Sequence, residues 1–173
     1  MKKLYPTLLL ILAIVLSSQA QDKPDPDNKL ALGAELPEFV YRTVDGETLN
    51  SEDLFGKVVL VNFYASWCGP CKKELPFVEK DLWQKYKGNE DFALLVIARQ
   101  EDWDKIGEFR ESSGLDLPYH PDPERDIYNM FAAKYIPRNY LFDKQGRLVL
   151  FSKGYREREF EELKKEISEL LED

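Results

Sequence analysis

The sequence predicts a single α/β domain in which a buried strand runs directly into a helix. Residues 58–61 form a short, β-branched apolar run of the kind that fills a central parallel strand. From Pro70 onward the apolar residues recur at helical spacing instead. A second apolar run, residues 91–98, follows that helix and completes a β-α-β unit. A chain of 173 residues, 43% hydrophobic and 32% charged, suits one soluble domain of ordinary size.

The first twenty residues have the pattern of a secretory signal peptide. Two lysines precede an uninterrupted apolar run, residues 8–16, and small residues lead up to Ala20, as at a cleavage site. The apolar run is shorter than the roughly 20 residues that a membrane-spanning helix needs. We therefore expect cleavage after Ala20 and a periplasmic or otherwise extracytoplasmic protein. The alternative is an uncleaved membrane anchor.

The charge of the chain excludes two classes of partner. Removal of residues 1–20 deletes two lysines and no acid, so the formal net charge moves from −8 to −10. A domain this acidic is unsuited to nucleic acid and to an anionic membrane surface. Residues 21–29, which contain two prolines and several charges, are predicted to be a polar linker to a domain that spans residues 30–173.

The domain is predicted to begin with a β-hairpin. Asp45-Gly46 is a turn signal, and it lies between two short strand-like segments, residues 38–42 and 47–49. One helical turn should follow, with Ser51 as its cap.

Both cysteines of the chain lie where the predicted strand meets the helix. A Cys-x-x-Cys on a first helical turn has its Cα atoms about 5–6 Å apart, a separation that a disulfide can bridge. Cys68 also lies at the positive end of the helix dipole, which stabilises a thiolate by up to about 2 kcal/mol. The pattern indicates thiol–disulfide exchange. The alternatives are a purely structural disulfide and half of a zinc site with His120 as a spare ligand, and we expect no metal.

The rest of the chain supplies further helices and a pair of antiparallel strands. Pro76 should kink the active-site helix because it removes one backbone hydrogen bond. The segment around His120 is predicted to be an exposed loop. Helices are predicted over residues 103–113 and 124–135, strands over 139–143 and 147–153, and an amphipathic stripe on a last helix over 160–171.

The cysteine pair and its surroundings resemble the thioredoxin superfamily. The resemblance covers about residues 30–172 and is closest to exported thioredoxin-like thiol-disulfide oxidoreductases of the TlpA/ResA type, which are related to the redoxin and AhpC-TSA proteins. It implies a thioredoxin fold: a central mixed β-sheet flanked by helices, with an extra N-terminal β-hairpin. The residues that carry it are Trp67-Cys68-Gly69-Pro70-Cys71, Pro76, Ile136-Pro137, the segment 33–39 and Asp45-Gly46.

We expect the two cysteines to have different roles. Cys68 should be the attacking thiol, because it lies nearer to solvent and to the helix end, and Cys71 should resolve the mixed disulfide. Trp67 should pack beside the thiols and offer partners an apolar surface. Gly69-Pro70 is the dipeptide of reducing thioredoxins, which favours a reductase.

The proton path should differ from that of ordinary thioredoxins. Those proteins carry a buried Asp six residues before the first cysteine, whereas this chain has Asn62, which cannot accept a proton. Glu74 lies three residues after Cys71, near the same helix face, and matches an acid that the exported family has at this position. A partly buried carboxyl would have a raised pKa and could shuttle the proton. The alternative is a solvated helix glutamate.

The resemblance also implies a substrate groove. Pro137 should form a cis peptide bond with Ile136 and leave the Ile136 backbone free to pair with an extended substrate strand. This chain has Arg138 where the family has small hydroxyl residues. We therefore expect a guanidinium on the open rim, where it could pair with a carboxylate of the partner; the alternative is an arginine that points to water.

The sequence thus predicts an exported thiol-disulfide oxidoreductase that reduces protein disulfides, with cytochrome c maturation as one possible setting. No cofactor is expected beyond a redox-active Cys68–Cys71 disulfide, and the electrons should come from a membrane thiol donor. Oxidation or isomerisation of substrates is left open, as is the oligomeric state. The alternatives are a peroxiredoxin-like peroxidase, disfavoured by the paired cysteines, and a non-catalytic binding module with this fold.

Overall fold

The computed structural model describes residues 25–172. The predicted signal peptide, residues 1–20, lies outside the described residues, as does the first part of the predicted linker. Within the described part of the chain, no helix combines the length and apolar character required to span a membrane.

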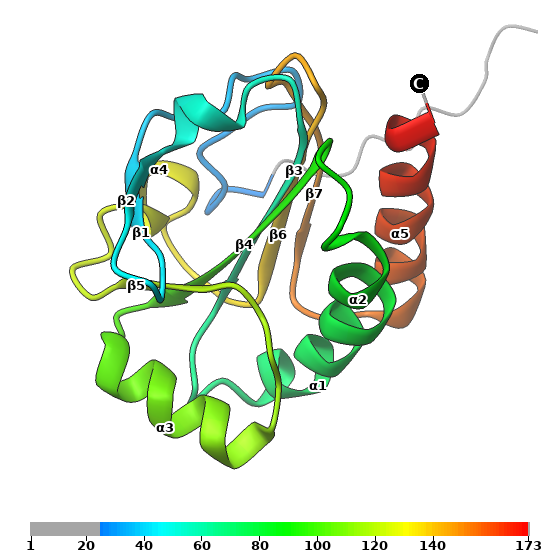
Figure 1. Cartoon of the computed structure of the whole chain (residues 1–173). Helices are drawn as coiled ribbons and strands as arrows, with labels where there is room; N and C mark the ends of the chain where they lie inside the picture. The colour runs from blue at the N-terminus through cyan, green and yellow to red at the C-terminus, as the bar shows by residue number, and fades with distance from the viewer. Residues whose placement is uncertain (1–24, 173) are drawn as a thin grey trace, which may run out of the picture.

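The fold is built on a five-stranded mixed sheet with the strand order β5-β4-β3-β6-β7 (Figure 1). β3 pairs in parallel with β4 and antiparallel with β6, so it is the central strand. All seven residues of β3 are buried, which explains why its sequence shows no polar alternation. The strands are β3 (Val58–Tyr64), β4 (Phe92–Arg99), β5 (Tyr119–Asp122), β6 (Arg138–Phe142) and β7 (Leu148–Lys153).

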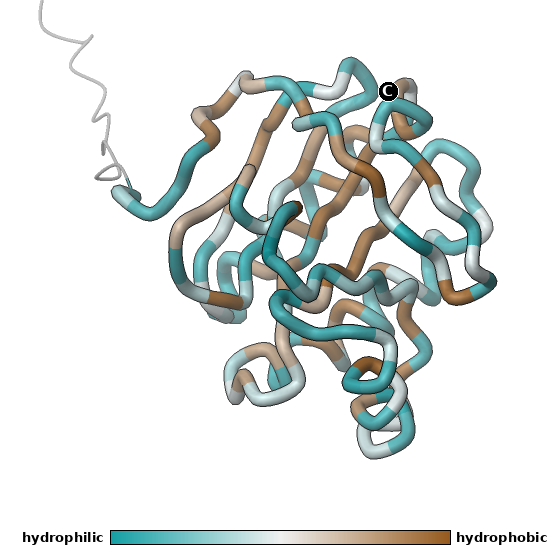
Figure 2. The backbone as a smooth tube through the Cα atoms, turned by 90° about the vertical axis from the view of Figure 1, so that its left-hand side faces the viewer, coloured by the Kyte–Doolittle hydropathy of each residue, from teal (hydrophilic) through white to brown (hydrophobic). Residues whose placement is uncertain are grey.

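Helices and a hairpin cover the two faces of the sheet. One face packs against α1 (Gly69–Phe77), α3 (Trp103–Ser113) and α5 (Glu157–Glu172) through one core cluster. The other face packs against α4 (Tyr128–Phe131) and the hairpin of β1 (Val40–Arg42) and β2 (Thr48–Asn50) through a second cluster. Figure 2 shows the hydrophobic residues along the interior strands and hydrophilic residues in the outer loops. The predicted mixed sheet, its flanking helices and the N-terminal hairpin are confirmed.

The active-site helix changes its geometry next to Pro76. α1 ends at Phe77, and a π-helical stretch, Val78–Trp83, joins it to α2 (Gln84–Tyr86). Pro76 lacks an N–H, so the regular hydrogen-bond ladder is interrupted at this point. The structure thus shows a change of helix type two residues after Pro76, whereas the predicted kink stays a prediction.

The prediction of an exposed loop around His120 is wrong. This segment is β5, an edge strand that pairs in parallel with β4. His120 is buried, its Nδ1 lies 2.8 Å from the carbonyl oxygen of Arg42, and its ring packs edge-on against Tyr41. Pro121 made this segment look like a loop in the sequence. Proline is excluded from central strands but is tolerated in an edge strand such as β5.

The predicted helix over residues 124–135 is also mostly wrong. Only α4 is helical there, because Arg125 and Tyr135 adopt left-handed conformations with φ of 65° and 69°. The carboxylate of Asp122 accepts hydrogen bonds from the N–H groups of Ile127 and Tyr128 at the start of this turn.

Two smaller predictions near the N-terminus need correction. Ser51 does not cap the turn that follows the hairpin: it is the first residue of a 3₁₀ turn, Ser51–Leu54, and Asn50 is the cap residue. The Ser51 hydroxyl instead accepts from the Phe39 N–H and donates to the Pro37 carbonyl, each at 2.9 Å.

The second correction concerns the predicted linker, because residues 25–29 are not a free tether. Asn28 forms a β-bridge with Ala132, and the Lys29 N–H donates to the Phe131 carbonyl.

Candidate active site

The two cysteines form a disulfide at the junction of β3 and α1. Their sulfur atoms are 2.08 Å apart and their Cα atoms 5.3 Å apart. Cys68 is the N-cap of α1, and its sulfur accepts a hydrogen bond from the Cys71 N–H at 3.2 Å. Unpaired N–H groups and the helix dipole at this end favour negative charge on Cys68, as a thiolate leaving group or nucleophile requires.

The two sulfurs differ in access. Cys68 retains 5% of its surface, whereas Cys71 is completely buried. Gly69 and Pro70 are exposed beside them. The first cysteine is therefore the one that another molecule can reach.

A cis-proline segment lies next to Cys68. The Ile136–Pro137 peptide bond is cis, and the Ile136 carbonyl oxygen lies 3.7 Å from the Cys68 sulfur. Trp67 is 62% exposed, so its ring offers an apolar surface beside the disulfide. The cis bond and the approach of Ile136 to Cys68 match the expected geometry. The packing of Trp67 beside the thiols and the substrate-binding roles of all three residues stay predictions.

Glu74 is buried in α1, one turn beyond Cys71, with 2% of its surface exposed. Two side-chain amides donate to its carboxyl group: Asn139 to Oε1 at 2.7 Å and Asn62 to Oε2 at 3.1 Å. Asn62 also donates to the amide oxygen of Asn139 at 2.8 Å. Asn62 and Asn139 face each other because β3 and β6 place them in register.

Burial raises the pKa of Glu74 to about 7, although the hydrogen bonds from Asn139 and Asn62 favour the charged form and oppose this rise. A carboxyl group with that pKa exchanges its proton near neutral pH. The alternative of a solvated Glu74 is therefore wrong.

The structure does not place Arg138 on an open rim. Its side chain is fully buried at the start of β6, where Nη2 donates to Asp25 at 2.9 Å and Nε donates to the Lys134 carbonyl at 2.9 Å. Strand alternation turns Arg138 to the face opposite Asn139, away from Glu74. The expectation of a guanidinium free to meet a partner overlooked Asp25, which is 113 residues away in the sequence.

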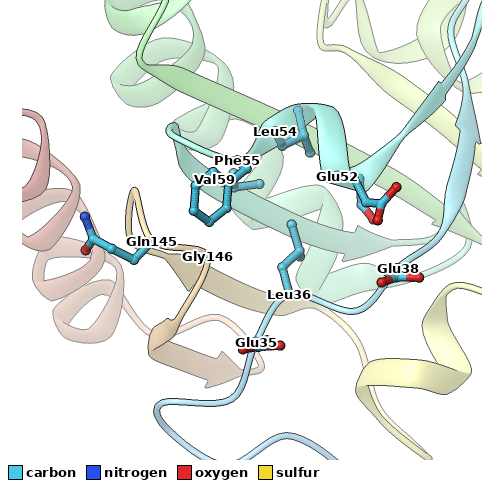
Figure 3. A pocket seen from close by; sticks show the side chains of 10 residues that line it. Glu35, Leu36, Glu38, Glu52, Leu54, Phe55, Val59, Gln145 and Gly146 are labelled. Carbon is cyan, nitrogen blue, oxygen red and sulfur yellow. The ribbon is translucent and has the colours of Figure 1, made fainter.

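A separate hollow of about 360 Å³ lies at the far end of β3 (Figure 3). Leu36 and Phe55 face each other across it, and Val59 at the start of β3 forms part of its wall. The cysteines follow the other end of β3, so this hollow is not part of the redox site. Among residues 25–172, no cluster of three or more His, Cys, Asp or Glu side chains could hold a metal ion.

With this geometry established, comparison with protein families gives a clear match. The family described as Redoxin matches residues 31–167, which is most of the chain. The chain belongs to the redoxin family.

Two relatives of this redoxin are named as thiol-disulfide oxidoreductases. The thiol-disulfide oxidoreductase ResA of Bacillus thuringiensis (strain Al Hakam) is 31% identical over 121 residues, 70% of this chain and 69% of the relative. ResA of Bacillus subtilis (strain 168) is 29% identical over 119 residues, 68% of this chain and 64% of the relative. This redoxin is therefore a thiol-disulfide oxidoreductase, and the predicted family and enzyme class are confirmed.

Solved structures show the same fold. A Bacteroides thetaiotaomicron protein proposed to be a protein disulfide isomerase aligns with a TM-score of 0.81 at 40% identity, over 85% of this chain and 94% of that one. A thiol:disulfide interchange protein of the thioredoxin family from Chlorobium tepidum TLS aligns with a TM-score of 0.64 at 26% identity, over 82% of this chain and 99% of that one. The predicted thioredoxin fold is thus confirmed.

Sequence reasoning missed two parts of the site. It identified Asn62 only as a residue that cannot accept a proton, and it did not connect Asn139 with Glu74. A polar residue within the apolar strand β3 was the available signal for Asn62, and Asn139, at the start of the strand β6, precedes a run of large apolar and aromatic residues. It also missed Glu101, which is buried and accepts hydrogen bonds from the N–H and hydroxyl groups of Ser66.

Proposed function

We propose that this redoxin reduces protein disulfides outside the cytoplasm. The observation that carries the proposal is the buried Glu74 carboxyl one helical turn from a cysteine pair of which only Cys68 can be reached. An exchange reaction needs one accessible nucleophile and a group that removes the proton from the second, buried thiol. Cys68, Cys71 and Glu74 meet these requirements.

In the reduced protein, the Cys68 thiolate attacks a substrate disulfide and forms a mixed disulfide, and the first substrate sulfur leaves as a thiolate that takes a proton from water. Cys71 then gives its proton to the Glu74 carboxylate and attacks the Cys68 sulfur. The second substrate sulfur leaves and takes up a proton. The substrate has gained two electrons, and the protein ends with the Cys68–Cys71 disulfide.

The residues beside Cys68 support a polypeptide as the substrate. Trp67 provides apolar contact area, and the backbone around cis-Pro137 offers the place where an extended substrate strand would lie. Gly69 and Pro70 form the exposed turn between the cysteines.

The location and the electron source belong to the same proposal. The composition of residues 1–20 supports export by a cleaved signal peptide, followed by a linker and a domain from about residue 30. In an oxidising compartment the disulfide must be reduced again after each turnover. We propose a membrane thiol protein as that donor and, from the resemblance to exported oxidoreductases, disulfides of cytochrome c maturation among the substrates.

Trapping tests this function directly. In a Cys71→Ser variant, a substrate should stay attached to Cys68 as a mixed disulfide, which mass spectrometry detects after alkylation. A Cys68→Ser variant is the matched control and should trap nothing. Traps through Cys71 would reverse the two roles, and failure of the wild-type protein to reduce insulin with dithiothreitol would favour a binding module.

Isomerisation is a second candidate, because the Bacteroides thetaiotaomicron relative is proposed to be a disulfide isomerase. Recovery of activity from a protein with scrambled disulfides, compared with the rate of insulin reduction, distinguishes the two reactions. A peroxide-consumption assay tests the peroxidase alternative, for which we expect no activity.

A further inference from the structure

Two arginines hold their guanidinium groups against one buried tyrosine ring. The Cζ atom of Arg99 lies 4.9 Å from the centroid of the Tyr128 ring, and that of Arg125 lies 5.3 Å from it. Both arginines are half-buried, and Tyr128 is fully buried. Burial, and then the charge of Arg125, lower the pKa of Arg99, so the two cations oppose each other at this position.

Within residues 25–172, neither guanidinium has a carboxylate within 4 Å. The Nε atoms of Arg99 and Arg125 are both buried and lack a hydrogen-bond acceptor there. Arg125 makes a single side-chain hydrogen bond, from Nη2 to the Ala133 carbonyl at 3.0 Å. By contrast, Arg138 on the same side of the sheet is neutralised by Asp25.

The acidic residues nearest in the sequence do not form ion pairs with Arg99 or Arg125. The two carboxylate oxygens of Asp122 accept hydrogen bonds from the backbone N–H groups that begin α4. Glu124 and Asp126, the neighbours of Arg125 in the chain, are exposed. The charge of Asp122 acts on Arg99 from beyond ion-pair distance, but the buried Nε groups of Arg99 and Arg125 lack an acceptor and are free to donate to an anionic ligand.

Two chains of contacts connect the arginine pair with the redox site. The Tyr128 hydroxyl donates to the Tyr135 carbonyl at 2.6 Å, and the next residue, Ile136, has its carbonyl oxygen 3.7 Å from the Cys68 sulfur. On the other side, Arg99 ends β4, which pairs in parallel with β3, the strand that leads to the cysteines. Ligands of such sheets bind beyond the carboxyl ends of the strands.

We propose that Arg99 and Arg125 form an anion site that binds a carboxylate side chain of the substrate polypeptide. The inference rests on the proposed function and names its substrate class: disulfides with acidic residues close to the attacked cysteine. The substrate strand that lies along residues 135–137 presents alternate side chains to the same face, which places the acid two residues from that cysteine. The net charge, −8 for the full chain and −10 after removal of residues 1–20, repels acidic chains at a distance, so the preference arises only at contact.

Matched disulfide peptides test this inference. The peptides differ only in having Glu or Gln two residues before or after the cysteine, and kcat/KM is measured with the reduced protein. We expect Arg99→Gln and Arg125→Gln each to lower kcat/KM for a Glu peptide about three- to tenfold, and to leave the Gln peptides within about twofold. The difference should shrink at about 1 M salt, where the Debye length falls to about 3 Å.

Two control variants separate charge from folding. Arg110→Gln removes an arginine from a surface ion pair with Asp116 and should leave both peptide classes unaffected. Arg99→Lys keeps the charge and should retain most of the preference for Glu. Thermal unfolding of Arg99→Gln and Arg125→Gln identifies a variant that does not fold, in which case Arg99→Lys and the binding measurement below decide.

Binding is measured separately from turnover. Peptides with serine in place of both cysteines are titrated into ¹⁵N-labelled protein, and the Nε–H resonances of Arg99 and Arg125 are followed. Shifts with the Glu peptide and none with the Gln peptide support the site, even if no peptide is reduced and the proposed function itself fails. Equal effects of both peptides, or shifts with inorganic phosphate alone, would overturn the inference.

Discussion

At the scale of single residues, the proposed proton transfer depends on how the buried carboxyl group of Glu74 is held. Glu74 receives hydrogen bonds from Asn139 and Asn62, and burial nevertheless keeps its pKa near 7. Asn62 therefore supports the acid at position 74 rather than replacing a thioredoxin aspartate. Glu74, the proposed proton acceptor, and its two amide donors come from three different elements, α1, β3 and β6.

Replacing the acid should change the pH dependence of exchange. In Glu74→Gln we expect a folded protein whose Cys71 thiol loses its proton acceptor, so resolution of the mixed disulfide slows and the step near pH 7 disappears. Stopped-flow measurement of mixed-disulfide resolution from pH 5 to 9 checks this. An unchanged pH profile would exclude Glu74 from proton transfer.

Removing one of the two amide donors to Glu74 should move the pH–rate profile of mixed-disulfide resolution to higher pH. Asn139→Leu deletes the hydrogen bond to Glu74 Oε1, which favours the carboxylate, so the pKa of Glu74 should rise above about 7. The midpoint of the rate profile should move to higher pH by about one unit, with the maximal rate nearly retained. Ser152→Ala is the matched control, because the Asn139 amide donates to the Ser152 hydroxyl at 3.3 Å, and within residues 25–172 Ser152 forms no hydrogen bond with the Glu74 carboxyl group.

At the scale of elements, residues 25–29 fasten α4 and β6 together. Asp25 pairs with the buried Arg138 at 2.9 Å and with Lys153 at 2.8 Å. Asp25→Asn leaves the Arg138 charge buried without a counter-charge, and we expect the free energy of unfolding to fall by about 2 kcal/mol. Urea denaturation measures the loss.

Asp27→Asn is the control for that experiment. Asp27 lies 3.9 Å from the exposed Lys134, and a loose surface pair of this kind contributes less than about 0.5 kcal/mol. Equal destabilisation by both substitutions would mean that the Asp25–Arg138 pair contributes no more to the free energy of unfolding than the surface pair does.

Elements with a strong local signal were predictable from sequence, and those fixed by distant partners were not. The apolar run of β3, the Asp45-Gly46 turn and the amphipathic stripe of α5 each depend on neighbouring residues only. β5 depends on pairing with β4, and its proline resembles loop sequence. The site followed the same division: the cysteine pair is local, whereas the partner of Arg138 comes from the far end of the chain.

At the scale of the whole molecule, Glu74 should make stability depend on pH. Its pKa is about 7 in the folded protein and 4.5 ordinarily, so the folded state binds the proton more tightly. The stability contribution is complete below about pH 4.5 and is lost as pH rises through 7, by about 3 kcal/mol in all. Urea denaturation of the oxidised protein at pH 5 and pH 8 measures it against Glu74→Gln.

His120 changes the free energy of unfolding with pH in the opposite direction to Glu74. The wild-type protein must therefore be compared with Glu74→Gln. Burial lowers the pKa of His120, so its contribution is present above about pH 6.5 and is lost as pH falls. The wild-type curve combines both effects, and the difference from Glu74→Gln isolates the carboxyl group. A difference that does not vary with pH would contradict the raised pKa of Glu74.

Pro121 on β5 affects how readily other chains can pair with the exposed edge of the sheet. An exposed sheet edge carries unpaired N–H and C=O groups to which an extended strand of another chain can add. Pro121 has no N–H to offer such a strand, and it stands at the outer edge of the five-stranded sheet. Pro121 therefore opposes the addition of another strand at this edge, and with it the association of copies of the protein through their sheets.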